Sequence, residues 1–172
     1  MIIAMKNDIN TYKRLLRLPC TIAVVGLSAE THRPSYRVAS YLQANGFKIV
    51  PVNPRYATLG QAVLGETCYA QLSDIPFAVH IVDVFRRTED VLPIALQAIQ
   101  IGVRCLWQQI GVENEQAAQL AQAAGLLSVM NRCLKIDHAQ AFTLPTPHYL
   151  IDETRLQKNL QRMQCIRLPC AD

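Results

Sequence analysis

The sequence predicts an α/β protein built on a doubly wound parallel sheet of five strands, with helices on both faces in a three-layer αβα arrangement. Two observations predict this class. Short apolar runs rich in β-branched residues, such as residues 22–25, are typical of strands buried on both faces. Helical segments that end at a glycine and lead directly into another apolar run recur along the chain, as in the αβ connections of such sheets.

The individual elements follow from the same patterns. Apolar spacing predicts helices over residues 8–18, 35–45, 88–101 and 114–124. Apolar runs predict strands over residues 22–25, 47–52, 78–85, 103–107 and 126–130. Thr88 is the expected N-cap of the helix that it begins. The connection over residues 54–76 is rich in turn formers, and we expect a short helix near Gln61 there. We expect right-handed crossovers and the strand order 3-2-1-4-5.

Length and composition restrict the class of protein. The chain of 172 residues is expected to form one main domain over residues 1–140, followed by an extension over residues 141–172. The formal charge of +4 belongs to the two ends, because residues 19–140 carry nine basic and nine acidic side chains. With no basic stripe or aromatic platform, nucleic acid is not an expected partner.

Hydropathy and cysteine usage predict a cytoplasmic protein. No apolar run approaches the ~18 residues of a membrane span, and the first residues lack the apolar core of a signal peptide. The six cysteines are scattered, so we expect reduced thiols. Cys105 is expected in the core, whereas Cys133 is either a packed residue or a thiol near the ligand. His80, within a predicted strand, is expected to be packed and hydrogen-bonded.

The turn after the first strand is the strongest local signal. Gly26 lets the backbone leave the sheet and approach a ligand, and Pro34 suits the first turn of the following helix. The free N–H groups and positive dipole end of that helix form an anion site, which Arg33 and Arg37 reinforce. These residues predict a turn that binds phosphate; a tight strand–helix turn without a ligand is the alternative.

The turn differs from the usual dinucleotide fingerprint. The pattern G-x-G-x-x-G requires three glycines, and only Gly26 is present here. An NAD site also requires an acidic residue after the second strand, where this chain has Asn53, Pro54 and Arg55. An arginine at that position favours an additional phosphate over a free ribose hydroxyl.

Ligands of open α/β sheets bind at the carboxyl ends of the strands. Those ends carry several arginines, among them Arg55, Arg86, Arg87 and Arg132. Their convergence on one rim predicts a ligand with several phosphates.

A series of short motifs occurs in order along the chain: Gly26-Leu-Ser, Arg33-Pro-Ser-Tyr-Arg-Val38, Pro51-Val-Asn-Pro54, Ile81-Val-Asp-Val-Phe-Arg86, Trp107-Gln-Gln-Ile-Gly-Val112 and Val129-Met-Asn-Arg-Cys133. Together they resemble the small stand-alone CoA-binding proteins, whose Rossmann-like domain is related to the N-terminal part of the succinyl-CoA synthetase α-subunit. The resemblance covers residues 15 to 140. The family usually has Asp where this chain has Asn131, which removes a carboxylate from the rim.

The resemblance implies coenzyme A as the ligand. Residues 28–31 and the start of the following helix would contact its phosphates, Arg55 the nucleotide phosphate, residues 84–86 the adenine and ribose, and residues 108–110 the pantetheine arm. The residues expected to bind CoA are Gly26, Leu27, Ser28, Arg33, Pro34, Ser35, Tyr36, Asn53, Pro54, Arg55, Val84, Phe85, Arg86, Arg87, Gln108, Gln109 and Ile110.

We expect binding without catalysis. The chain has no Ser-His-Asp grouping, metal-ligand spacing or P-loop, and Glu30 and Asp83 are isolated near the rim. Two alternatives stay open: an α-like subunit of an NDP-forming acyl-CoA synthetase system that takes its histidine from another chain, and an NAD-binding redox sensor.

The last residues differ in kind from the main domain. Residues 144–160 resemble the opening segment of PLP-dependent decarboxylases over about 20 residues, without the barrel or a cofactor lysine. We expect an extended stretch followed by an amphipathic helix over residues 153–163, whose apolar face packs either on the domain or on a second subunit in a homodimer.

Overall fold

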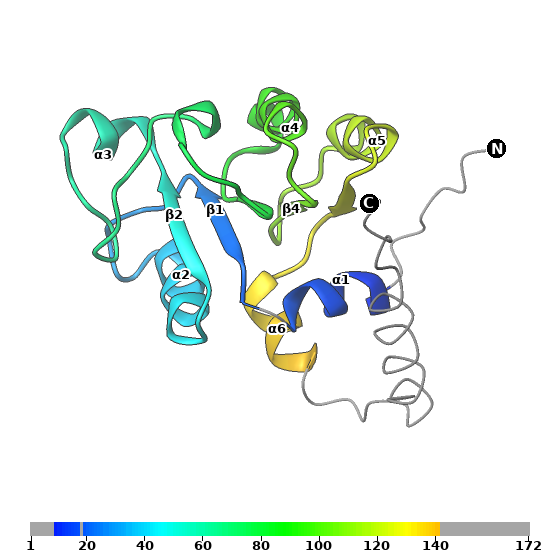
Figure 1. The fold of residues 1–172 in the computed structure, drawn as a ribbon, viewed down its shortest axis with the longest axis horizontal. Helices are drawn as coiled ribbons and strands as arrows, with labels where there is room; N and C mark the ends of the chain where they lie inside the picture. The colour runs from blue at the N-terminus through cyan, green and yellow to red at the C-terminus, as the bar shows by residue number, and fades with distance from the viewer. Residues whose placement is uncertain (1–8, 18, 142–172) are drawn as a thin grey trace, which may run out of the picture. The chain divides into compact units, whose positions relative to one another are not determined.

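A computed structural model describes residues 9–17 and 19–141, and within them it confirms the predicted fold class (Figure 1). All strand pairs of the five-stranded sheet are parallel. The strands are β1 (Thr21–Val25), β2 (Lys48–Val52), β3 (Ile81–Val84), β4 (Cys105–Gln108) and β5 (Leu127–Val129). The α-helices are α1 (Ile9–Leu16), α2 (Pro34–Ala44), α3 (Pro54–Thr58), α4 (Val91–Gln100), α5 (Glu115–Ala123) and α6 (Leu134–Ala141).

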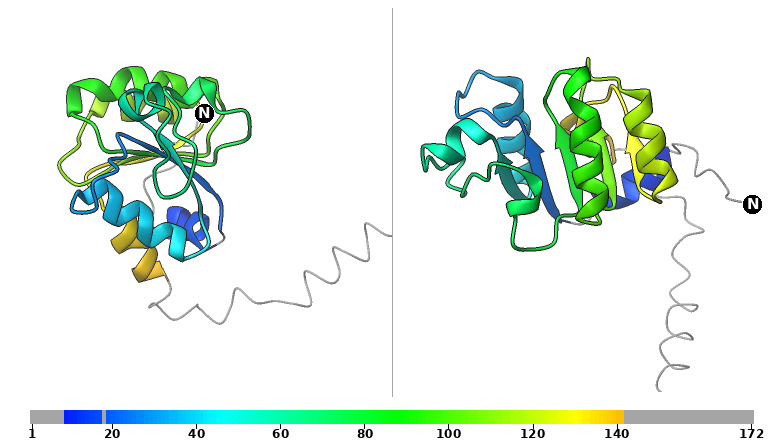
Figure 2. Two further views of the ribbon diagram at one scale, coloured as in Figure 1. Left: turned by 90° about the vertical axis from the view of Figure 1, so that its left-hand side faces the viewer. Right: turned by 90° about the horizontal axis from the view of Figure 1, so that it is seen from above.

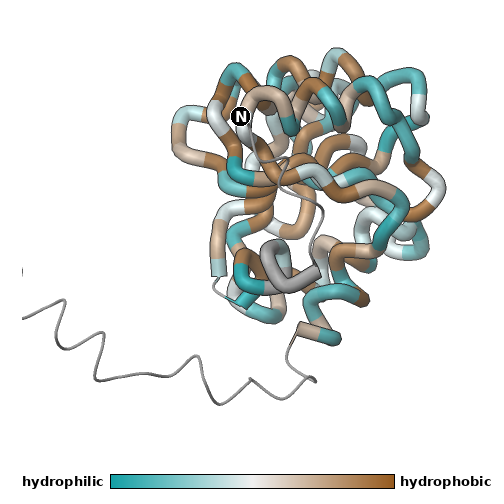
Figure 3. The backbone as a smooth tube through the Cα atoms, turned by 90° about the vertical axis from the view of Figure 1, so that its right-hand side faces the viewer, coloured by the Kyte–Doolittle hydropathy of each residue, from teal (hydrophilic) through white to brown (hydrophobic). Residues whose placement is uncertain are grey.

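The helices form two layers, one on each face of the sheet. Helices α4 and α5 cover one face, and α1, α2 and α6 cover the other (Figures 1 and 2). Each layer encloses its own apolar cluster, because alternate residues of every strand point to opposite faces. Ile22 and Val24 belong to the cluster under α2, and Ala23 and Val25 to the cluster under α4. The hydrophobic stretches accordingly follow the strands inside the domain, with hydrophilic loops around them (Figure 3).

The strand order is β2-β1-β3-β4-β5, and the predicted order 3-2-1-4-5 is wrong. The third strand pairs with the free side of β1 instead of extending the sheet beyond β2. The position beyond β2 is taken by Tyr69, which forms a single parallel bridge with Val52. The long connection after β2 therefore contributes one bridging residue at this edge before it returns to the centre of the sheet.

Local predictions had mixed outcomes. Pro34 lies in the first turn of α2, as predicted, and is the first residue of that helix; Gly46 follows the helix with a φ of +87°. Thr88 is not an N-cap, because it lies inside a short 3₁₀ turn (Thr88–Asp90) that precedes α4. The short helix expected near Gln61 occurs earlier, as α3, and α6 was not predicted.

Two predicted packing roles hold. Cys105 is completely buried. His80 lies just before β3, where its Nδ1 accepts a hydrogen bond of 3.2 Å from the Thr21 amide. Among the described residues, none of the helices is both long and apolar enough to span a bilayer. The predicted C-terminal helix over residues 153–163 lies outside the described residues.

Candidate functional site

The chain leaves β1 at Gly26, in a conformation that only glycine adopts without strain. Its φ is +87°, and its amide donates a hydrogen bond of 2.8 Å to the Val52 carbonyl. A Cβ on Gly26 would lie 2.5 Å from the Phe85 carbonyl oxygen. The residue is therefore required because the end of β3 passes close to the turn, whereas the sequence suggested close approach of a ligand.

Hydrogen bonds within the turn shape the start of α2. The Ser28 amide donates to Ser35 Oγ at 3.2 Å, and the Glu30 amide donates to Ser28 Oγ at 3.1 Å. Helix α2 begins at Pro34, and its cap residue Arg33 supplies no capping side chain. The amides of Ser35 and Tyr36 form no hydrogen bond with any described residue. The helix thus presents unpaired donors and its positive dipole end at this edge of the sheet.

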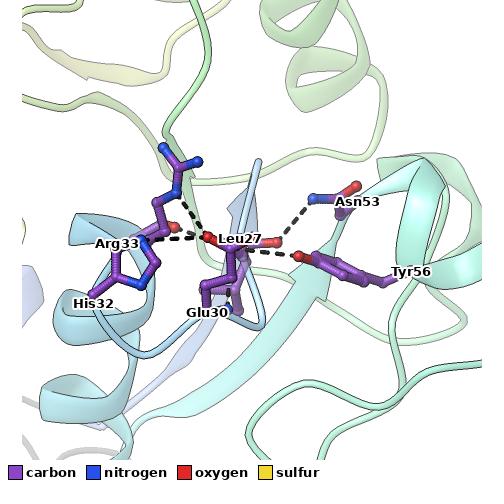
Figure 4. Close-up of polar contacts among 8 residues, drawn as sticks. Leu27, Glu30, His32, Arg33, Asn53 and Tyr56 are labelled. Carbon is purple, nitrogen blue, oxygen red and sulfur yellow. Dashed lines mark hydrogen bonds and ion pairs between the residues drawn. The ribbon is translucent and has the colours of Figure 1, made fainter.

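Asn53 joins this turn to the end of β2. Its Nδ2 donates to the Leu27 carbonyl at 2.9 Å, while its Oδ1 accepts from the Arg55 amide at 3.1 Å and caps α3. Tyr56, on α3, brings its hydroxyl to 3.4 Å from Ser28 Oγ. This contact is the largest cause of a pKa of Tyr56 below its ordinary value of 10. Figure 4 shows Asn53 and Tyr56 reaching the turn from one side, opposite His32 and Arg33.

These segments enclose a cavity of about 330 Å³ at the carboxyl ends of β1, β2 and β3. We call it the phosphate-side cavity. It brings together eight of the predicted residues: Gly26, Ser28, Arg33, Pro34, Ser35, Asn53, Arg55 and Phe85. Its lining also includes Glu30, which lies within residues 28–31 that were predicted to contact the phosphates, and Tyr56, which was not predicted to bind the ligand. Tyr56 had one signal in the sequence, its position one turn after the predicted strand end.

A second cavity of about 310 Å³ adjoins the first and shares Gly26 with it. It lies between the start of α4 and the segment after Tyr69, and its lining includes the predicted residues Pro54 and Arg86. Side chains such as Leu72 and Ile94 make it more apolar than the phosphate-side cavity. A larger cavity of about 470 Å³ lies at the opposite, amino-terminal end of the strands, between α1, α2 and α6.

Several predicted residues line neither carboxyl-end cavity. Leu27 and Val84 are completely buried in the two apolar clusters, and Tyr36 packs partly buried against the first of them. Arg87 is exposed and lies 3.9 Å from Glu89. Ile110 is 63% exposed. The remaining two, Gln108 and Gln109, point into the protein.

The side chains of Gln108 and Gln109 hold the loop after β4 in place. Gln108 Oε1 accepts from the Asn114 amide at 2.7 Å, and its Nε2 donates to the Asn114 carbonyl at 3.2 Å. Gln109 Nε2 donates to both carboxylate oxygens of Asp83, at 2.9 and 3.1 Å. Asp83 is completely buried in β3 and was wrongly placed at the rim by the sequence. Burial raises the pKa of Asp83 to about 7, which the hydrogen bond from Gln109 offsets in part.

Asn131 secures the same loop from outside. It has a φ of +53°, its Oδ1 accepts from the Gly111 amide at 2.9 Å, and its Nδ2 donates to the Glu113 carboxylate. An aspartate could not donate to Glu113 and would place two carboxylates together. The side-chain amide of Asn131 is therefore suited to this position because it can donate a hydrogen bond to Glu113.

The arginines at the rim are mostly paired with acids. Arg86 lies 3.2 Å from Asp90, and Arg132 forms two bonds of 2.7 Å with the buried Asp137. Arg33 donates from Nε to Glu30 at 3.1 Å. Among the arginines that line the phosphate-side cavity, Arg55 forms no ion pair with a described residue. The rim thus carries less uncompensated charge than a count of its arginines suggests.

A parallel sheet with a cavity at its carboxyl ends, over the start of the first crossover helix, defines the class of Rossmann-like α/β domains. Within that class, residues 20–139 match the model of the CoA binding domain family. The chain belongs to this family.

The chain is also similar to proteins of known sequence or structure. The chain is 36% identical over 127 residues to the uncharacterized protein YneT of Bacillus subtilis, covering 74% of this chain and 91% of that protein. It is 33% identical to a hypothetical protein from Pyrococcus horikoshii, with a TM-score of 0.73 over 78% of this chain and 92% of the other.

A larger protein shares the fold. Part of a dinucleotide-forming acetyl-coenzyme A synthetase from Ca. Korarchaeum cryptofilum matches 69% of this chain and 27% of its own length, with 23% identity and a TM-score of 0.58. At this identity the likeness concerns the fold alone.

Proposed function

We propose that the protein binds coenzyme A or an acyl-CoA in the two adjoining cavities at the carboxyl ends of its strands and carries out no chemistry of its own. One observation carries the proposal: a chain of the CoA binding domain family has a cavity lined by the start of α2, Arg33 and Arg55. Unpaired helix amides and arginine guanidinium groups are the donors that phosphate groups prefer in proteins.

The lining suggests how the ligand lies. The pyrophosphate would meet Ser28 and the amides of Ser35 and Tyr36, and the 3′-phosphate would meet Arg55, the lining arginine that has no acidic partner among the described residues. The adenine and ribose would lie beside Phe85 and Arg86, next to the more apolar cavity. Since Gln108 and Gln109 are engaged inside the protein, the pantetheine arm would be contacted by the loop backbone and Ile110.

The surroundings of the three described histidines favour binding without catalysis by a histidine. His32 contacts Glu30 at 3.4 Å, His80 accepts from the Thr21 amide, and His138 lies 3.1 Å from the Tyr41 hydroxyl. These histidines lie apart in the fold, and none of them lines either carboxyl-end cavity. The alternative is an α-like component of an NDP-forming acyl-CoA synthetase, which shares this fold and would need a separate chain for its histidine.

Calorimetric titration with CoA, dephospho-CoA and NAD at two salt concentrations tests the proposal. CoA should bind more tightly than dephospho-CoA. Binding should weaken at higher salt because salt screens the attraction between the phosphates of the ligand and the arginines of the protein. Arg55→Ala should weaken CoA binding by about tenfold, the equivalent of one charge-assisted hydrogen-bonded contact, and leave dephospho-CoA nearly unchanged.

Arg104→Ala is the matched control, because Arg104 is exposed at the amino-terminal end of β4. It removes the same charge and should leave every affinity unchanged. Binding of NAD without binding of CoA would contradict the proposal and favour a redox sensor. Copurification with a second chain, and phosphorylation of that chain in the presence of CoA and a nucleotide, would favour the synthetase component.

A further inference from the structure

The phosphate-side cavity contains an acid beside one of its two arginines. Glu30 lines the cavity, and its Oε2 accepts from Arg33 Nε at 3.1 Å. The same oxygen lies 3.4 Å from His32 Nε2. Figure 4 shows His32 and Arg33 converging on Glu30 from the same side of the turn.

The backbone fixes this contact. The Glu30 amide donates to Ser28 Oγ at 3.1 Å, and the Glu30 carbonyl accepts from the Arg33 amide at 3.0 Å. Glu30 and Arg33 are thus the ends of one tight turn and lie side by side before any ligand arrives. Because the turn leads directly into α2, Glu30 also lies close to the positive dipole end of that helix, which stabilises a carboxylate there.

A ligand phosphate needs the same donors that Glu30 uses. Arg33 presents its Nε and one terminal nitrogen as a fork for an oxyanion, and Glu30 already accepts from Nε. A phosphate that binds to both of these Arg33 nitrogens must displace the Glu30 carboxylate. Until the carboxylate is displaced, its negative charge repels the phosphate. A pyrophosphate has the advantage over the carboxylate because its two phosphates offer at least four non-bridging acceptor oxygens and can also accept from the free amides of α2.

We propose that Glu30 is an internal competitor for the ligand phosphate: its carboxylate holds Arg33 in the ligand-free protein and is displaced when a phosphate binds. The inference rests on the proposed function for the identity of the ligand, and the competition itself applies to any phosphate that binds at Arg33. Glu30 is then a residue that sets affinity, in contrast to Arg55, whose guanidinium is available to the ligand from the start.

The test compares wild type, Glu30→Gln, Arg33→Ala and the double variant, titrated with CoA and separately with inorganic pyrophosphate. Glu30→Gln keeps the size of the side chain and removes its charge. It should tighten the binding of both probes by up to about fivefold, the upper end of the range expected for the loss of an exposed ion pair. In the Arg33→Ala background, the gain in affinity from Glu30→Gln should be clearly smaller, because the arginine for which Glu30 and the phosphate compete is absent.

Glu115→Gln is the matched control, because Glu115 lies in the first turn of α5 and lines neither carboxyl-end cavity. It changes the net charge by the same amount and should leave both affinities unchanged. An equal gain from Glu30→Gln with and without Arg33 would overturn the competition and leave only repulsion at a distance. No gain over Glu115→Gln would overturn the inference as well.

The two probes separate this inference from the proposed function. If pyrophosphate binds more tightly to Glu30→Gln, with a smaller gain in the Arg33→Ala background, while CoA binds to none of the proteins, the competition stands and CoA is the wrong ligand. If CoA binds to the wild type and Glu30→Gln has no effect on either probe, the proposed function stands and the competition is wrong. If neither probe binds to either protein, both proposals fail.

Discussion

Two loops at the same edge of the sheet behave in opposite ways. The first-strand loop (residues 26–33) follows β1, and the fourth-strand loop (residues 108–114) begins with the last residue of β4; both carry polar side chains. The first-strand loop lines the phosphate-side cavity with Ser28, Glu30 and Arg33. The fourth-strand loop turns Gln108 and Gln109 inward, where they bond to Asn114 and Asp83.

The difference has a physical cause in the backbone. At Gly26 the positive φ turns the chain out of the sheet at once, so the following polar residues stand over the start of α2. Gln108 is still part of β4, and the buried carboxylate of Asp83 on the neighbouring strand requires a donor, which Gln109 supplies. Polar residues after a strand therefore line a cavity in one loop and maintain the fold in the other.

The largest expected effect is that of Gly26→Ala. The new Cβ would lie 2.5 Å from the Phe85 carbonyl oxygen, and the φ of +87° is unfavourable for alanine. The steric clash and the backbone strain therefore both destabilise the folded state. We expect a loss of about 3 kcal/mol or more in the free energy of unfolding, measured by chemical denaturation. Gly60→Ala is the control, because its φ is +62° and no atom lies within 4 Å of the new Cβ. It should cost only about 1 kcal/mol, and equal losses would contradict the close approach of β3.

A smaller effect is expected from Gln109→Leu in the fourth-strand loop. The substitution leaves the buried Asp83 carboxyl without its donor, and we expect a loss of about 2 kcal/mol in the free energy of unfolding. Gln119→Leu, on the exposed face of α5, removes a similar amide and should change stability by less than about 0.5 kcal/mol. If Gln109→Leu lowered CoA affinity without lowering stability, Gln109 would be a ligand contact and the contrast between the loops would fail.

The pH dependence of stability tests a single group, the completely buried carboxyl of Asp83. The pKa of Asp83 is about 7 in the folded protein and 3.8 as its ordinary value. Between these values the folded state holds a proton that the unfolded state has released, so stability falls as pH rises from about 4 to 7. The slope from this one group is at most about 1.4 kcal/mol per pH unit.

Asp83→Asn should remove that contribution, so the difference in unfolding free energy between wild type and variant should change across this pH range and become constant above it. The measurement is chemical denaturation of both proteins at pH 5, 6, 7 and 8. A constant difference at all four values would show that Asp83 titrates at the same pH in the folded and unfolded states.

The sequence was sufficient for the features that depend on local chemistry. Gly26 and Pro34 were identified from the conformations that each residue favours, and the apolar runs identified all the strands of the sheet. The order of the strands could not be obtained in this way, because nothing local distinguishes a return to the free side of β1 from an extension beyond β2. Tyr69, which occupies the predicted place of a full strand, lies in a segment with no strand pattern.

The candidate site was only partly predictable for a related reason. Position after a strand identified Ser28, Asn53 and Arg55, which line the cavity, and equally Gln108 and Gln109, which point inward. The direction of a side chain depends on partners that are distant in the sequence, such as Asp83 for Gln109. The pairing of Glu30 with Arg33 was close in sequence, but it becomes evident only when the turn between them is known.

The most direct test of this account is a CoA titration of the full chain followed by NMR of its amide groups. We expect the NMR signals of the backbone amides of Ser28, Ser35, Tyr36 and Arg55 to change their chemical shifts with increasing CoA. The signals of the side-chain amides of Gln108 and Gln109 should keep their chemical shifts. Shifts concentrated on those two side-chain amides, with the first-strand loop unaffected, would contradict it and transfer the ligand site to the fourth-strand loop.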